Sequence, residues 1–430
     1  DKGIGLKMKM NDGWPYGCAD NITAIDIVRN RSLTGQTHII TGGDKGIGFA
    51  TALALARANA TVIILSHHLA SGTLAASRVA AQTGNCRVSM VPLELASFKS
   101  VRDVAAKISA QHDQVHALIC NAGSGFSTEG LTQDGLDAVL QIDFLGHALL
   151  IERLLPALRK VGGRVIEISS QFAWWACSKM HNAGLSMNGP FGSCLQRVAD
   201  FYAAATGHYP VSKDFRARVL PPTSDRHEIN RYALAKYAQV LHAAALSHRE
   251  QLQNATTPVR VFSVDPGSVY TDMVRSNLRR THTLQLVEKC VAQKGVNSCG
   301  MSTPEQGAAT QVFLAMAPSE LLEAAAERFP QWTRCTPKHS VVDALFSQLG
   351  HSAATAFLSA FYVQTVALIG APPRTPLSSR IDDVLAEQRL YAEQISAVPW
   401  LHFTLMIGAG LSTLLITRTM WTRPSLSRLL

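Results

Sequence analysis

A tyrosine and a lysine four residues apart, Tyr232 and Lys236, are the side chains best suited to acid–base chemistry in this chain. On a helix, this spacing places both side chains on one face. A free phenol has a pKa of about 10, and a nearby ammonium group lowers it by stabilising the phenolate. The pair could then move a proton near neutral pH. The same spacing also occurs on ordinary helix surfaces, so the neighbouring motifs decide its meaning.

A glycine-rich turn lies far upstream of this pair. An apolar run at 37–40 precedes it, and an alanine-rich helical pattern follows to residue 57. Glycines let the backbone approach a pyrophosphate, and the helix N-terminus offers N–H groups and a positive dipole end. A strand before and a helix after are the context that such a turn requires. Either the turn binds no ligand, or its residues contact a dinucleotide: Thr41, Gly42, Gly43, Lys45, Gly46, Ile47 and Gly48.

The residues after the second predicted strand, 61–65, bear on the choice of cofactor. Folds selective for NAD usually place Asp or Glu there, bonded to the ribose 2′-hydroxyl. This chain has Ser66, His67 and His68 instead, and Lys45 adds a cation inside the turn. Cations without a carboxylate favour NADP(H), with His67 as a contact and NAD(H) as the alternative. The two histidines could also be solvated loop residues.

Alternating strand and helix patterns predict the fold. The strands are expected near 37–41, 61–65, 88–93, 116–120, 164–169 and 259–264, and a helix at 229–249 carries Tyr232. This alternation predicts an α/β fold: a Rossmann-type, doubly wound parallel sheet in three α/β/α layers. The other motifs then fall at the carboxyl ends of strands, where ligands bind in such sheets.

In this order the motifs resemble the short-chain dehydrogenase/reductase family, and most closely its retinol dehydrogenase and WW-domain-containing oxidoreductase branch. The likeness extends to the stretches 23–35, 131–147 and 304–310. The resemblance covers about residues 23–320, and a weaker resemblance is found near 375–392. No WW domain is visible.

The resemblance implies a role for each matching position. Tyr232 is expected to be the acid/base, Lys236 its partner, and Ser170 the hydrogen-bond donor to the substrate oxygen. Lys236 would also contact the cofactor ribose, and Tyr232 would stand beside the nicotinamide. The remaining cofactor contacts implied by the family are Glu94 at the adenine, Asn121, Ala122 and Gly123 at the adenosine side, and Pro266, Gly267 and Thr271 at the nicotinamide and pyrophosphate.

Asp143 departs from the family pattern, which usually has an asparagine that holds a water of the proton relay. A carboxylate near Lys236 would keep the ammonium charged and partly cancel its effect on Tyr232. We therefore count Asp143 among the catalytic positions and expect slower or pH-shifted catalysis. The alternative is a salt bridge that serves only the core.

Composition limits the other classes of function. The 430 residues are 47% hydrophobic and 17% charged, which supports a large core, and the net charge is +9. The cations are scattered rather than interleaved with aromatic residues, so we expect no nucleic acid partner. The eight cysteines form no C-x-x-C pair, and no histidine cluster completes zinc spacing. We therefore expect reduced thiols and no metal.

The sequence pattern divides the chain into four regions. We expect a loose arm at 1–22, the dehydrogenase domain at 23–392, a membrane anchor at 398–418 and a basic tail at 419–430. Within the domain, 171–228 and 268–303 look inserted. The first would form either a lid for an apolar substrate or a surface insertion with its own small core. The second would be either an amphipathic helix at a membrane surface or a charged, solvated helix.

Two apolar stretches bear on membrane association. Residues 400–417 carry no formal charge, approach the length of about 20 residues that a bilayer needs, and are bracketed by Trp400 and Trp421. They predict a C-terminal anchor in the endoplasmic reticulum or another organelle membrane, with open topology; a helix docked on the protein is the alternative. Residues 344–373 also lack Asp, Glu, Lys and Arg and could span or lie in a membrane, but we favour a buried helix followed by the last sheet strand.

The expected function is an NADP(H)-dependent oxidoreductase that interconverts a lipophilic alcohol and its aldehyde or ketone, such as a retinoid or steroid. The alternative is an NADP-binding scaffold with little or no activity. A hydrolase that uses Ser170 is disfavoured, because no G-x-S-x-G turn surrounds this serine. A homodimer is possible.

Overall fold

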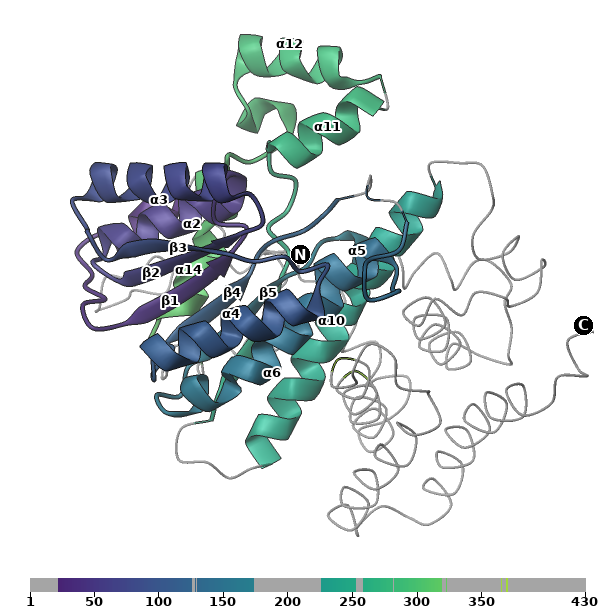
Figure 1. Cartoon of the computed structure of the whole chain (residues 1–430). Coiled ribbons are helices and arrows are strands. Elements are labelled where there is room, and N and C mark those ends of the chain that lie inside the picture. The colour runs from purple at the N-terminus through teal and green to yellow at the C-terminus, as the bar shows by residue number, and fades with distance from the viewer. Residues whose placement is uncertain are drawn as a thin grey trace, which may run out of the picture.

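The centre of the molecule is a parallel β-sheet. The computed structural model describes residues 22–125, 128, 130–173, 226–252, 258–280 and 282–318, together with 322, 365 and 369. Within these residues, six strands pair in the order β3-β2-β1-β4-β5-β6 (Figure 1). Their bounds are β1 Thr37–Thr41, β2 Thr61–Ser66, β3 Val88–Pro92, β4 Ala117–Cys120, β5 Arg164–Ile168 and β6 Arg260–Val264. Every neighbouring pair is parallel, as the sequence predicted.

The strand order creates a crevice. The chain starts at β1, moves outward through β2 and β3, and then returns to the other side of β1 with β4, β5 and β6. The connections that leave β1 and β4 therefore diverge at the carboxyl ends of these strands, where ligands bind in doubly wound sheets. All residues of β1 and β4 are buried, because helices cover both faces of the sheet.

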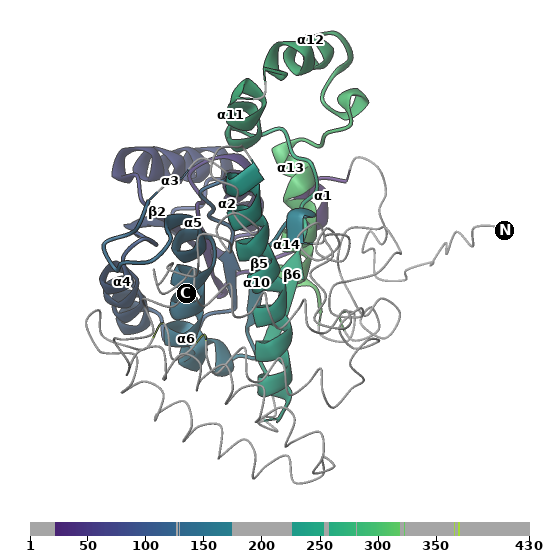
Figure 2. The same cartoon turned by 90° about the vertical axis from the view of Figure 1, so that its right-hand side faces the viewer.

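Helices form the outer two layers. One face carries α1 (Ala24–Val28), α2 (Gly46–Arg57), α3 (Leu69–Thr83), α13 (Pro304–Gly307) and α14 (Ala309–Met316). The other carries α4 (Phe98–Gln111), α6 (Gly146–Arg159) and α10 (Arg226–Leu252), with α5 (Ala138–Leu140) and the π-helical turn η1 (Gln141–Leu145) leading into α6 (Figure 2). Each layer packs its own hydrophobic cluster against the sheet, which confirms the predicted α/β/α class.

The segment 268–303 forms a helical hairpin that stands away from the sheet (Figures 1 and 2). It contains α11 (Asp272–Arg280), α12 (Leu284–Lys294) and the short 3-10 turn η2 (Asn297–Cys299). A bridge between Val269 and Ser302 closes its base: the amide of Tyr270 donates to the carbonyl of Ser302 at 2.9 Å. The base of the hairpin is thus fixed beside the end of β6.

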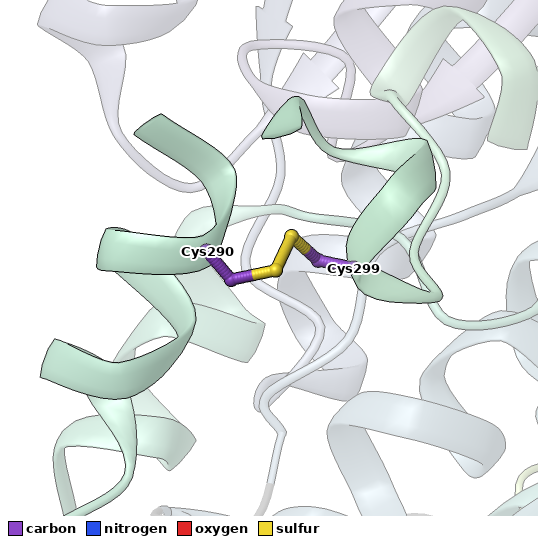
Figure 3. Close-up of a disulfide and its surroundings, with 2 residues drawn as sticks. All are labelled: Cys290 and Cys299. Atoms are coloured by element: carbon purple, nitrogen blue, oxygen red, sulfur yellow. A yellow bond between two sulfur atoms is a disulfide. The ribbon is translucent and has the colours of Figure 1, made fainter. Parts of the chain in front are cut away.

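A disulfide joins Cys290 of α12 to Cys299 of η2, with their Cα atoms 6.0 Å apart (Figure 3). The prediction of reduced thiols is wrong for this pair. The chain reverses at Gly295, whose φ of +80° favours glycine, and brings Cys299 back beside α12. Among the described cysteines, Cys86 is exposed and free, and Cys120 is buried and free.

Several predicted regions lie outside the described residues. They are the arm at 1–21, the insertion from 174 to 225, most of 344–373, the weaker resemblance at 375–392, the anchor at 398–418 and the tail at 419–430. Over the part of the chain that the structure describes, no helix has the length and apolar character to cross a membrane.

Candidate active site

Tyr232 and Lys236 lie on the face of α10 that packs against the sheet, and both are buried. The ammonium nitrogen of Lys236 donates a hydrogen bond to the carbonyl of Ile168 at 2.9 Å. The same nitrogen lies 5.3 Å from the centre of the Tyr232 ring. The hydroxyl of Ser169 donates to the carbonyl of Lys236 at 2.7 Å and fixes this turn of α10 against the end of β5.

Ser170 and Tyr232 are joined by a side-chain hydrogen bond. Ser170 follows β5 directly, whereas Tyr232 comes from α10, so the contact bridges the sheet and the helix layer. The ring of Phe172 meets the Tyr232 ring edge-on, with the centroids 5.9 Å apart. A hydroxyl, a phenol and an ammonium group therefore converge at the carboxyl end of β5.

Asp143 enters this cluster from η1. Its Oδ2 atom lies 3.9 Å from Lys236 Nζ, and its side chain is fully buried. Its Oδ1 atom accepts hydrogen bonds from the amide and the hydroxyl of Ser124, at 2.6 and 2.8 Å. The sequence expectation that Asp143 pairs with Lys236 agrees with this geometry.

Two side chains that the sequence did not single out hold the backbone of Asp143. The amide of Gln239, on α10, donates to the carbonyl of Asp143 at 2.8 Å, and His147 Nδ1 lies 3.3 Å from the same oxygen. Single π-helical turns often occur at functional sites. Here the turn presents a carbonyl to side chains of α10 and α6, and so fixes the position of Asp143.

The protonation of Tyr232 differs from the expectation. Burial raises the pKa of Tyr232, the charge of Asp143 raises it further, and the hydrogen bond with Ser170 only partly opposes them. Burial also lowers the pKa of Lys236, against the charges of Asp143 and Glu167. The expected lowering of the tyrosine pKa is therefore wrong for the protein without cofactor, because burial and the charge of Asp143 outweigh the hydrogen bond with Ser170.

The glycine turn is packed too tightly for side chains. A β-carbon added at Gly48 would lie 2.1 Å from the carbonyl oxygen of Gly42 and 2.5 Å from the side-chain nitrogen of Asn121. That nitrogen donates to the carbonyls of Thr41 and Gly42, at 3.0 and 3.2 Å. Gly42 itself has a φ of +62°. The first turn of α2 thus approaches the end of β1 as closely as backbone allows.

Thr41 serves this turn from inside. Its hydroxyl oxygen accepts hydrogen bonds from the amides of Asn121 and Ala122, at 2.9 and 3.0 Å, and lies 2.9 Å from His147 Nε2. Burial, and then the charge of Lys236, lower the pKa of His147 to about 3, so this imidazole is neutral. The hydroxyl of Thr41 therefore ties β1 to β4 and α6.

The start of α2 fits a pyrophosphate. Its N-cap residue, Lys45, makes no side-chain capping bond, so the helix N-terminus has free donors for an anion. The side chain of Thr271 lies beside Gly46: an added β-carbon there would be 3.4 Å from the threonine methyl. The segment after β6, with Gly267 at a φ of +76°, thus folds back toward the glycine turn.

The surroundings of His67 correct one expectation. Burial and the charge of His68 lower the pKa of His67, whereas the charges of Glu94 and Asp44 act in the opposite direction. Asp44 accepts a hydrogen bond from the hydroxyl of Ser71 at 2.9 Å. No carboxylate ends β2, but two carboxylates from neighbouring segments act on this histidine. The region is therefore less cationic than the sequence suggested.

The hairpin reaches the site through Met273 of α11. A β-carbon added at Gly125 would lie 3.1 Å from Met273 Cγ. One added at Gly123 would lie 3.7 Å from Met273 Cε and 3.4 Å from Asp143 Oδ2. Met273 and the buried carboxylate of Asp143 thus both pack near the loop after β4. Within the described ranges, no group of three or more His, Cys, Asp or Glu residues could hold a metal ion.

Comparisons with known proteins agree with this geometry. A family model described as short chain dehydrogenase matches residues 36–188. The WW domain-containing oxidoreductase of Pongo abelii is 29% identical over 316 residues, which cover 73% of this chain and 66% of that protein. The chain thus spans about two thirds of this relative.

Two mouse proteins are also similar. The polyprenol dehydrogenase of Mus musculus is 30% identical, covering 66% of this chain and 72% of that protein. Retinol dehydrogenase 11 of Mus musculus is 28% identical, covering 67% of this chain and 75% of that protein.

Proposed function

The chain belongs to the short-chain dehydrogenase/reductase family of oxidoreductases, and from this premise we propose that it interconverts a lipophilic alcohol and its aldehyde or ketone. The observation that carries the proposal is the hydrogen bond between Ser170 and Tyr232 beside the buried ammonium of Lys236. A phenol that is hydrogen-bonded to a hydroxyl and faces a cation can pass a proton to or from a substrate oxygen.

Each residue of the proposed site has one task. Tyr232 donates its phenolic proton to the substrate oxygen during reduction and accepts it during oxidation. Ser170 donates a hydrogen bond to the same oxygen, and Lys236 stabilises the phenolate. When bound, a nicotinamide dinucleotide supplies or accepts the hydride at the substrate carbon. Asp143 opposes the effect of Lys236 on Tyr232, because its charge raises the phenol pKa.

The glycine turn supports a dinucleotide as the cofactor, because the helix and the strand approach each other closely there. The carbonyl oxygen of Gly42 lies 2.1 Å from the position that a β-carbon would take at Gly48. NADP(H) is favoured by Lys45, His67 and His68, and NAD(H) is the alternative that Asp44 and Glu94 would suit. The other proposed cofactor contacts are Asn121, Ala122, Gly123, Pro266, Gly267 and Thr271.

The substrate class rests on relatives whose names include retinol and polyprenol. A lipophilic substrate is also compatible with Phe172 beside Tyr232 and with Met273 beside the loop after β4. We further propose anchoring in an organelle membrane through 398–418, and a homodimer as the default assembly. The disulfide at Cys290 supports exposure of the hairpin to an oxidising compartment.

A scaffold with little turnover is the second candidate, and one observation favours it. Asp143 pairs with Lys236 at 3.9 Å and raises the pKa of Tyr232, so it weakens the phenol as a proton donor and lowers the fraction of phenolate that can accept a proton. Such a protein would bind the dinucleotide and a partner without efficient chemistry.

The deciding experiment mixes the purified full chain with NADPH or NADH and a panel of apolar aldehydes and ketones. We expect turnover that is lost in Tyr232→Phe, while cofactor binding, followed by fluorescence, persists. Tyr237→Phe, which changes another buried tyrosine of α10, is the matched control and should retain turnover. Tight cofactor binding without turnover on any substrate would favour the scaffold and contradict the oxidoreductase.

A further inference from the structure

A second pair of titratable side chains is buried next to the proposed site. His242 Nδ1, on α10, lies 2.7 Å from Glu167 Oε1, on β5, and neither side chain has any exposed surface. Strand alternation explains the contact: Val165 and Glu167 face α10, whereas Ile166 and Ile168 face the opposite helix layer. No step of the proposed reaction uses this pair.

Glu167 is linked to Lys236 through the strand that carries it. The next residue, Ile168, accepts the hydrogen bond from Lys236 Nζ at 2.9 Å. The negative charge of Glu167 acts on Lys236 in the same direction as Asp143 and raises the lysine pKa against the effect of burial. Among the described residues, Glu167 Oε2 has no hydrogen-bond partner, so the carboxylate is not saturated by donors.

We propose that Glu167 and His242 form a positioning pair that keeps the buried amine of Lys236 in its charged form against the carbonyl of Ile168. The inference rests on the proposed function, in which this charge stabilises the phenolate of Tyr232. Burial alone favours the neutral amine, and Glu167 offsets this tendency. His242 in turn balances Glu167, since a buried carboxylate without a partner is strongly destabilising.

Groups on several elements surround the two cations. The titratable side chains that act on or face Lys236 are Asp143 of η1, Cys120 of β4, His147 of α6, Glu167 of β5 and Tyr232 of α10. Those that act on His242 are Glu167 of β5, Glu152 of α6 and Arg249 of α10. Glu152 therefore acts on His242, whereas Glu167 acts on both cations. This difference provides a matched control.

The test follows the ε-carbon NMR signal of Lys236 against pH in the full chain, grown with isotope-labelled lysine and without cofactor. Loss of one signal in Lys236→Met assigns it. We expect Glu167→Gln, which keeps a hydrogen-bonding side chain, to lower the titration midpoint of Lys236 by about one pH unit or more. Glu167→Asp, which keeps the charge, and Glu152→Gln should leave the midpoint within about a third of a unit of wild type.

A second measurement needs no variant: the ring-nitrogen NMR signals of His242 in the wild-type chain should be those of a charged imidazole at neutral pH. An unmoved Lys236 midpoint in Glu167→Gln, an equal fall in Glu152→Gln, or a neutral His242 would overturn the pair. If Glu167→Gln does not fold, the His242 signals decide alone. Neither readout needs turnover. An inactive protein would therefore contradict the oxidoreductase proposal without contradicting this one.

Discussion

The carboxylate of Asp143 lies 3.9 Å from the ammonium nitrogen of Lys236, and both side chains are buried. Two hydrogen bonds from Ser124 hold the other oxygen of this carboxylate in place. The negative charge therefore has a fixed position close to the cation that the proposed reaction depends on. Its removal is the most direct way to change the acidity of Tyr232.

Asp143→Asn should lower the pKa of Tyr232, since the charge of Asp143 is the second cause, after burial, that raises it. We expect alcohol oxidation at neutral pH to become about threefold to tenfold faster, which corresponds to a shift of about half to one pKa unit. Steady-state kinetics measure the effect. Asp113→Asn changes an exposed carboxylate and is the control. A slower Asp143→Asn enzyme would mean that the carboxylate itself takes part in proton transfer.

The direction of the reaction should depend on pH in wild type. Burial and Asp143 raise the pKa of Tyr232, so the phenol stays protonated through neutral pH. Carbonyl reduction, which uses the phenolic proton, should be flat through neutral pH and fall only under alkaline conditions. Alcohol oxidation, which needs the phenolate, should rise with pH over the same range. Initial rates in both directions across a pH series test this, and a reduction rate that falls through neutral pH would contradict it.

Gly48→Ala should abolish dinucleotide binding. The added β-carbon would lie 2.1 Å from the carbonyl oxygen of Gly42, which is a backbone atom and not the end of a flexible side chain. Gly43→Ala is the graded control, because its added carbon meets only the side chain of Ile64, at 3.1 Å. We expect a loss of affinity of at least about a hundredfold in the first variant, or about 3 kcal/mol, and a smaller loss in the second. Fluorescence titration with NADPH and NADH measures both. Equal affinities in the two variants would argue against the close backbone contact.

Thr41→Val should destabilise the fold. It removes the hydroxyl that accepts hydrogen bonds from the amides of Asn121 and Ala122, and leaves partly buried donors without an acceptor. We expect a loss of about 2 to 4 kcal/mol in the free energy of unfolding, because two amides and His147 lose a partner together. Urea denaturation gives the value. Thr41→Ser keeps the hydroxyl and should retain most of the stability; an equal loss in Thr41→Ser would contradict the assignment of the Thr41→Val effect to the hydroxyl.

His242 should stabilise the fold in a pH-dependent way. Burial alone would lower its pKa, but the charge and the hydrogen bond of Glu167 raise it above the unfolded value of about 6.5. Its contribution is therefore complete below about pH 6.5 and is lost as the pH rises through the folded pKa. The difference in the free energy of unfolding between wild type and His242→Gln should shrink over that range. A constant difference would mean that His242 is neutral in the folded protein.

The strands and the glycine turn could be predicted because their signals are local. Apolar runs such as 37–41 and 61–65 mark buried parallel strands, and the glycines from Gly42 to Gly48 run from the end of a strand into the first turn of a helix. The contact of Asp143 with Lys236 followed from a family position. By contrast, the contacts of Gln239 and His147 with the carbonyl of Asp143 depend on a π-helical turn, which leaves no periodic pattern.

Two further features had sequence signals that were not used. Glu167 interrupts an otherwise apolar strand, Val165 to Ile168, and a charge at such a position needs a buried partner. The cysteines at 290 and 299 stand nine residues apart, too far for a C-x-x-C pattern, and only the reversal at Gly295 brings them together. Both depend on where the chain returns in space.

The covalent link between α12 and η2 makes the history of a preparation an experimental variable. Its sulfurs close the outer part of a hairpin whose α11 places Met273 near Gly123, in the loop that Asp143 also approaches. In protein produced in a reducing cytosol, or stored with dithiothreitol, this hairpin would lack the disulfide between Cys290 and Cys299. Kinetic constants from two laboratories would then describe two chemical species unless the thiol content of each batch were counted.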